Sequence, residues 1–122
     1  MKAISLLALV VLASTKPLSA KVSEVLKDPA KYDGKAVAVK GTVAEFKART
    51  SKAANDYVVF DLVEGKDHLA VYGQGKLQKA PKDGDKVTVT GKYAKERKVG
   101  SRTFKNEIDA SARLDKSFGV KK

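Results

Sequence analysis

Apolar and polar residues alternate with a period of two in five separate stretches of this chain. In the first stretch, which begins at Lys35, residues Val37, Val39 and Val43 fall on one face. A period of two is typical of β-strands that bury one face. The pattern therefore predicts five strands, and the other four are "YVVFDLV" at 57–63, "HLAVYG" at 68–73, "KVTVTGKYA" at 86–94 and "RTFKNEIDASAR" at 102–113.

Two of these stretches have a glycine in the middle, Gly41 in the first and Gly91 in the fourth. Long strands that bend at glycine suit a small barrel, in which strands must turn corners sharply. Phe46 falls out of phase with the first stretch, and a bulge near Gly41 or Ala44 would return it to the apolar face. We predict an all-β fold, a five-stranded barrel over residues 35–113, with three phenylalanines in its core: Phe46, Phe60 and Phe104.

The first twenty residues have the pattern of a secretory signal. Lys2 is followed by an uncharged apolar run from Ala3 to Ala13, and the segment ends on Ser19 and Ala20. The run is too short to span a bilayer, which needs about 20 apolar residues. We expect cleavage after Ala20, with Ala13 as the alternative site, and thus an exported protein that is periplasmic or secreted.

Between this signal and the barrel, residues 21–34 are expected to form a short helix followed by a turn. Ser23 is the expected N-cap, because a hydroxyl oxygen can accept a hydrogen bond from the free N–H groups of the first helical turn. Pro29 limits the helix, since the residue before a proline avoids the helical conformation.

The remaining segments lack periodicity. Residues 47–56 and 74–85 are polar and are expected to be loops, the second with one helical turn at 76–79. Residues 114–122 form a basic tail, which we expect to fray as chain ends commonly do.

The chain expected after cleavage forms one domain and is strongly basic. Removal of Lys2 and Lys16 leaves 23 basic residues against 14 acidic ones, a net charge of +9. Such a charge attracts anionic ligands such as nucleic acid, acidic glycans or lipid head groups, although it also serves solubility alone. The absence of cysteine excludes a disulfide framework and a thiolate metal site.

The segment "KYAKERKVGSRTFK" at 92–105 is rich in cations and lies between two predicted strands. It carries six basic residues against the single acid Glu96. Two interpretations are open: a loop that binds a polyanion, or a solvated turn between strands. The same alternatives apply to Arg49 and Lys52 in the earlier loop.

Most of the chain resembles the OB-fold, over roughly residues 36–110. The resemblance rests on "VAVKGTVAEFKARTSKAANDYVVFDLVEGKDHLAVYG" and "KDGDKVTVTGKY". Within the OB-fold, these segments are similar to the nucleic-acid-binding branch, which includes the anticodon-binding domains of class II tRNA synthetases. In that branch the ligand lies across the second and third strands, between the loops that join strands one to two and four to five.

The resemblance implies a ligand face on residues 57–61 and 68–72, flanked by two basic loops. Tyrosine rings there would stack on bases while loop cations contact phosphates. The implied ligand-binding residues are Lys47, Arg49, Lys52, Tyr57, Val59, His68, Tyr72, Lys95, Arg97, Lys98 and Arg102.

We therefore predict an exported, monomeric module that binds single-stranded nucleic acid or a similar polyanion, with no stable membrane insertion after signal cleavage. The alternative is an envelope interaction domain that binds a protein or an acidic glycan and has no role with nucleic acid.

An enzyme is not expected, and neither a metal nor a cofactor is predicted. The sequence has no nucleophile motif, and His68 is its only histidine. Another exported OB-fold, the heme carrier of cytochrome c maturation, relies on a His-x-x-x-Tyr motif and a retained membrane anchor. His68 and Tyr72 have that spacing, but they lie in a strand at mid-chain rather than in the late segment where that family has its motif. We interpret the spacing as coincidence.

Overall fold

The computed structural model describes residues 16–75 and 80–122, so most of the expected signal and the helical turn expected at 76–79 lie outside the described residues. Two short helices and seven strands are found in the described part. Their bounds are β2 Leu18–Lys21, α2 Val22–Lys27, α3 Pro29–Tyr32, β3 Ala36–Thr50, β4 Asp56–Glu64, β5 Asp67–Gln74, β6 Lys86–Val99, β7 Arg102–Asp109 and β8 Gly119–Lys121.

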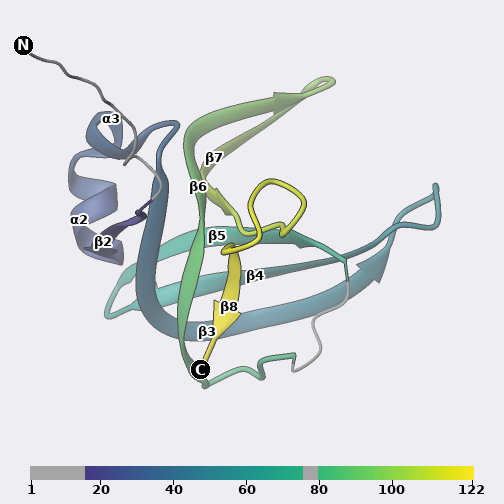
Figure 1. Ribbon diagram of the computed structural model, residues 1–122, viewed down its shortest axis with the longest axis horizontal. Coiled ribbons are helices and arrows are strands. Elements are labelled where there is room, and N and C mark those ends of the chain that lie inside the picture. The colour runs from purple at the N-terminus through teal and green to yellow at the C-terminus, as the bar shows by residue number, and fades with distance from the viewer. Residues whose placement is uncertain (1–15, 76–79) are drawn as a thin grey trace, which may run out of the picture.

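Five of these strands close into a ring in the order β3, β4, β5, β7, β6 and back to β3. All neighbours are antiparallel except β5 and β7, which run parallel. The predicted five-stranded barrel is therefore confirmed. The short strands β2 and β8 add to the outside of the ring, and α2 and α3 lie at one end of it (Figure 1).

The core is built by the alternating apolar positions that predict the strands. Leu62, Leu69, Tyr93 and Ile108 are fully buried. Helix α2 adds Val22 and Val25 to the same cluster, and α3 adds Tyr32. The remaining core residues are Val37, Val39, Val43, Phe60, Val71, Val87, Val89 and Ala110.

Strand β3 changes phase at a bulge, as its sequence predicts. Its register against β4 shifts between Ala44 and Lys47, and Glu45 between them has a left-handed backbone with φ of 54°. The shift returns Phe46 toward the interior, where it packs against the core with its ring 5.9 Å from the ring of Phe60.

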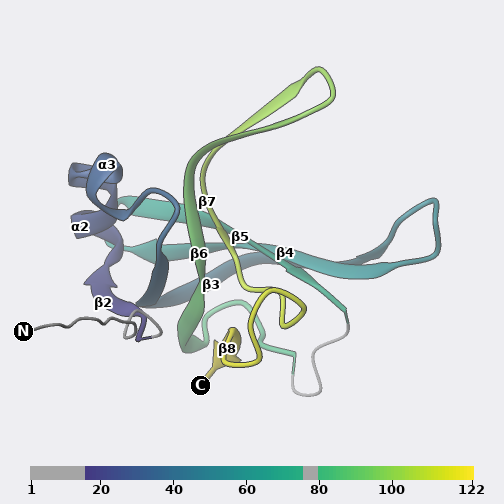
Figure 2. The same cartoon turned by 45° about the horizontal axis from the view of Figure 1, so that its top comes forward.

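Two segments expected to be loops are long hairpins instead. Strand β3 continues to Thr50 and pairs with β4 from Asp56, so that only residues 51–55 form the turn. Strand β6 continues to Val99 and pairs with β7 from Arg102. We call these the β3–β4 arm and the β6–β7 arm; both project from the barrel (Figures 1 and 2). Their sequences lack apolar alternation because much of each arm is exposed on both faces.

Phe104 is not part of the core, contrary to its in-phase spacing with Ile108. Asn106 lies between them with a left-handed backbone, φ of 53°, which interrupts the alternation. As a result Phe104 is half-buried on the outside of the sheet, whereas Glu107 and Ile108 are both buried.

Both ends of the described chain form short strands that pair with the barrel, which the sequence does not predict. Strand β2 spans the predicted cleavage position and pairs in parallel with Val37–Lys40 of β3. Lys21 rather than Ser23 precedes helix α2, and its N–H donates to Glu24 Oε1 at 2.8 Å. At the other end the tail does not fray, because β8 pairs with Thr88–Thr90 of β6 and Val120 packs against the core. The two described helices, α2 of six residues and α3 of four, are both too short to span a bilayer.

Among the described glycines, Gly91 has the least room for a side chain, at the place where β6 passes from β3 to β7. A Cβ atom on Gly91 would lie 2.4 Å from the carbonyl oxygen of Asp109. We predict that Gly91→Ala lowers the free energy of unfolding by about 1–3 kcal/mol, because the backbone of β7 must move to admit the methyl group. Urea denaturation followed by circular dichroism measures this loss.

Gly73→Ala is the matched control, since its Cβ would meet only Val58 Cγ2 at 3.5 Å, an ordinary contact. Its free energy of unfolding should stay within about 0.5 kcal/mol of the wild type. Equal losses in the two variants would mean that glycine is needed for its flexibility in both strands, and not for the close approach at Gly91.

Candidate ligand-binding face

The outward residues of β4 and β5 form one continuous face of the barrel. Val59 lies opposite Tyr72, and Asp61 lies opposite Ala70. Alternate residues of a strand point to the same side, so Tyr57 belongs to this face as well. All five are partly exposed. These five residues of the implied face therefore lie together on one side of the barrel.

Aromatic rings and arginines meet in a row on this face. The ring centroids of Tyr57 and Tyr72 are 5.8 Å apart. The Arg97 guanidinium carbon lies 5.7 Å from the Tyr72 ring and 5.1 Å from the Phe104 ring, and that of Arg102 lies 5.6 Å from Phe104. We call these five residues the aromatic–arginine cluster. Each cation–π contact at an exposed site stabilises its pair by roughly 0.5–1 kcal/mol.

The buried carboxylate of Glu107 pairs with Arg97, a member of this cluster. Glu107 Oε1 accepts a hydrogen bond from Arg97 Nε at 2.8 Å and lies 2.8 Å from a terminal guanidinium nitrogen of the same arginine. The Glu107 side chain is 8% exposed, while that of Arg97 is 37% exposed. Arg97 is therefore held at the surface by a charge that solvent hardly reaches.

Two hollows border this ion pair. One, of about 260 Å³, is lined by apolar groups such as Val59 and Phe104, and its charged residues are Glu45, Lys47, Asp61 and Glu107. The other, of about 240 Å³, is lined by Arg97, Glu107 and residues including Leu114. A larger hollow of about 650 Å³ lies near Lys40 and Lys86, but no aromatic side chain lines it. The face with the cluster is thus the better candidate for a flat, aromatic ligand.

The left-handed residue Asn106, which turns Phe104 outward, is held in place by the buried Tyr93. The Tyr93 hydroxyl donates a hydrogen bond to Asn106 Oδ1. Burial raises the pKa of Tyr93 above its usual value, and the Asp33 carboxylate adds a smaller effect in the same direction. The hydroxyl therefore keeps its proton and remains a donor at neutral pH.

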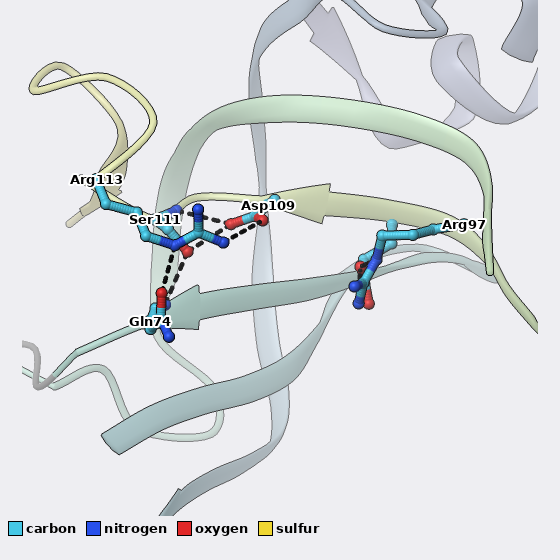
Figure 3. A network of polar contacts seen from close by, with 6 residues as sticks. Gln74, Arg97, Asp109, Ser111 and Arg113 are labelled. Atoms are coloured by element: carbon cyan, nitrogen blue, oxygen red, sulfur yellow. Dashed lines mark hydrogen bonds and ion pairs between the residues drawn. The ribbon is translucent and has the colours of Figure 1, made fainter. Parts of the chain in front are cut away.

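A polar network fixes the chain where it leaves β7. The N–H of Gln74 donates to Ser111 Oγ at 2.8 Å, and the Ser111 hydroxyl donates to Asp109 Oδ1 at 2.5 Å. The Arg113 guanidinium donates to Gln74 Oε1 and lies 4.0 Å from Asp109 Oδ2. These groups gather at the end of β5, while Arg97 lies further along the sheet (Figure 3).

The other cations predicted from the sequence lie on the two arms, outside the cluster. Lys47 and Arg49 are in β3, opposite Val59 and Tyr57, and Lys52 is in the turn of the same arm. Lys95 and Lys98 are exposed on β6. Lys47 and Arg49 pair with residues of the face, whereas Lys52, Lys95 and Lys98 do not.

His68 does not meet the other predicted residues. It is exposed near the β4–β5 turn, opposite Val63, and four residues before Tyr72. At about 3.3 Å per strand residue, the two positions are roughly 13 Å apart, so their side chains do not converge on one ion. Within residues 16–75 and 80–122, no group of three or more His, Asp or Glu side chains could hold a metal ion.

Two residues of this site were missed in the sequence. Phe104 was assigned to the core because its spacing to Ile108 fits an unbroken strand. Asn106 was the available signal, since asparagine adopts the left-handed conformation more readily than most residues. Glu107 gave a weaker signal, a carboxylate directly beside a core isoleucine.

A solved structure of yeast Stn1 and Ten1 is similar to this chain in fold. The TM-score is 0.55 at 10% sequence identity, over 78% of this chain and 60% of that chain. The chain therefore spans less than two thirds of the solved chain, and the likeness concerns the fold alone. No curated protein matches the sequence.

Residues 17–109 match the CcmE domain, whose members are periplasm-facing heme chaperones of cytochrome c maturation. These proteins bind heme and protein partners and are not enzymes. The match agrees with a periplasm-facing location and with the prediction that the chain is not an enzyme. It does not support the predicted lack of membrane insertion, because members of this family are typically anchored in the membrane at their N-terminus. It shows that the prediction of single-stranded nucleic acid as ligand and partner is wrong.

The comparison also corrects the family within the fold. The OB-fold is confirmed, but the branch that matches is not the one that binds tRNA anticodons. It is the heme-carrying relative, although His68 and Tyr72 lie at mid-chain and not in the late segment where that family has its motif. This chain belongs to the CcmE domain family.

Proposed function

We propose that this chain is a periplasmic heme-binding module that holds heme without a covalent bond on the aromatic–arginine cluster. The observation that carries the proposal is the row of Tyr57, Tyr72 and Phe104 rings interleaved with Arg97 and Arg102 on one face of the barrel. The family's heme-chaperone role supports heme as the cargo.

The chemistry of the face suits this cargo. Heme is a flat aromatic macrocycle with carboxylate groups at one edge. Aromatic side chains pack against such a ring, each pair contributing about 0.5–1.5 kcal/mol beyond the area it buries. Arginine pairs well with carboxylates because its planar guanidinium donates parallel hydrogen bonds.

Covalent attachment through the family's histidine does not fit this chain. Residues 110–122, which follow the matched segment, contain no histidine. His68 lies at the far end of β5 from the cluster. The proposed binding therefore rests on contacts with the rings and arginines of the cluster.

We also place the module on the periplasmic side, in keeping with the family. Cleavage after Ala20 remains a prediction. It would remove most of β2, and the family match already begins at residue 17.

A second candidate function is docking of an acidic envelope protein or an acidic glycan. The exposed cations of the two arms favour it, because they stand outside the cluster and complement an anionic surface. These residues are Lys47, Arg49, Lys52, Lys95, Lys98 and Lys105.

The first test is a titration of the protein with hemin, followed at the Soret band. We expect saturable binding by the wild type and affinity about tenfold weaker for Tyr72→Ala, because that ring contacts both Tyr57 and Arg97. Phe118→Ala is the control, since Phe118 is a half-buried ring outside the cluster. Equal weakening by both variants would contradict the assignment of the face.

A second test concerns the carboxylates of heme. Arg102→Ala should weaken hemin binding by roughly threefold to tenfold but leave binding of heme dimethyl ester unchanged, because the ester has no charge to pair with Arg102. Lys31→Ala is a matched control: Lys31 also lies over an aromatic ring, 5.4 Å from that of Tyr32, but outside the cluster. If Arg102→Ala weakened both ligands alike, Arg102 would act through Phe104 and not through a carboxylate.

A further inference from the structure

Glu107 is the one charged residue that is buried in the described part of the chain, with 6% of its surface exposed. A buried carboxylate loses the solvation it had in water, and an ion pair recovers this loss only in part. A barrel of this kind can be built with an apolar residue at such a position. The burial of Glu107 therefore calls for a reason other than stability.

The partner of Glu107 is held on several sides at once. Arg97 gives two nitrogens to a single oxygen of Glu107, each at 2.8 Å. Its guanidinium also lies within 6 Å of the rings of Tyr72 and Phe104. An arginine has five N–H donors, and within the described residues no further hydrogen bond uses the remaining ones. Arg97 thus combines a fixed position with free donors and a side chain that is 37% exposed.

We propose that Glu107 is a positioning residue, which holds Arg97 between the two rings so that its free donors receive a carboxylate of a flat aromatic ligand. The inference rests on the proposed function and deepens it. Fixing the arginine in advance removes the loss of side-chain freedom that an unrestrained arginine would suffer on binding. The ion pair is then maintained for binding, and an apolar pair would serve the fold equally well.

The direction in which Glu107→Gln changes the affinity for hemin distinguishes a positioning role from a purely electrostatic one. Glu107→Gln removes a negative charge from the floor of the face. By charge alone this change should strengthen the binding of an anionic ligand. If Glu107 positions Arg97, the affinity for hemin should instead fall by about tenfold, as for the loss of one charge-assisted hydrogen bond.

Asp61→Asn is the matched control, because Asp61 lines the same hollow as Glu107 and has no ion pair there among the described residues. It should bind hemin roughly twofold more tightly, the effect of removing one partly exposed negative charge. Opposite effects of the two substitutions support the inference. Tighter binding by both would overturn it.

A double variant keeps the test independent of folding. Arg97→Met with Glu107→Met removes both charges at similar volume, and we expect its free energy of unfolding to equal or exceed that of the wild type. It should bind hemin about tenfold more weakly and lose the preference for hemin over heme dimethyl ester. A folded double variant that keeps the wild-type affinity and preference would overturn the inference.

If the double variant does not fold, the Arg97→Lys variant tests the inference instead, through its preference for hemin over heme dimethyl ester. A lysine can still pair with Glu107 but lacks the fork of donors, so a lower preference for hemin over its ester supports the inference and an unchanged one overturns it. Failure of the proposed function gives a different result, because the wild type would then not bind hemin at all.

Discussion

The five-stranded ring closes where β6 leaves β3 and joins β7, and the rest of the molecule depends on this seam. Lys92 pairs with both strands, opposite Ala36 on one side and Asp109 on the other. Beside it, the Asp109 carbonyl comes so near to Gly91 that no side chain fits between them. The backbone groups of three strands thus share one small region, where their hydrogen bonds must all be satisfied together. The seam fixes the directions in which β6 and β7 continue.

Beyond the barrel, both arms begin at residues with a left-handed backbone. Glu45 opens the β3–β4 arm with a bulge, and Asn106 interrupts β7 at the base of the β6–β7 arm. The bulge at Glu45 returns Phe46 to the core, whereas the break at Asn106 turns Phe104 away from it. Phe104 is moved to the outer face, where it meets Arg97 from the neighbouring strand. The aromatic–arginine cluster therefore depends on barrel closure and on the break in β7 at Asn106.

The nucleic-acid and heme hypotheses use the same side chains for the same physical reasons. Nucleic-acid bases and a porphyrin are both flat aromatic rings that carry anionic groups nearby, so stacking rings and guanidinium groups suit either ligand. Residue chemistry alone does not separate the two, and the fold does not either, since one fold carries many functions. The family match over residues 17–109 separates them. Residues 110–122 contain no histidine, so the proposed binding of heme relies on the aromatic–arginine cluster.

Local periodicity determined the barrel, the bulge near Ala44 and most of the core, because each depends on residues close in the sequence that bury one face. The resemblance to the OB-fold, and not periodicity, implied that Tyr57, Tyr72 and Arg97 border one face. The length of the arms, the outward turn of Phe104 and the order in the tail depended on partners distant along the chain: β4 for β3, Tyr93 for Asn106 and β6 for β8. The pairing of Arg97 with buried Glu107 likewise arises only in the folded chain. A buried charge is tolerated only when an oppositely charged partner pairs with it, and a partner brought close by folding cannot be identified from a local sequence pattern.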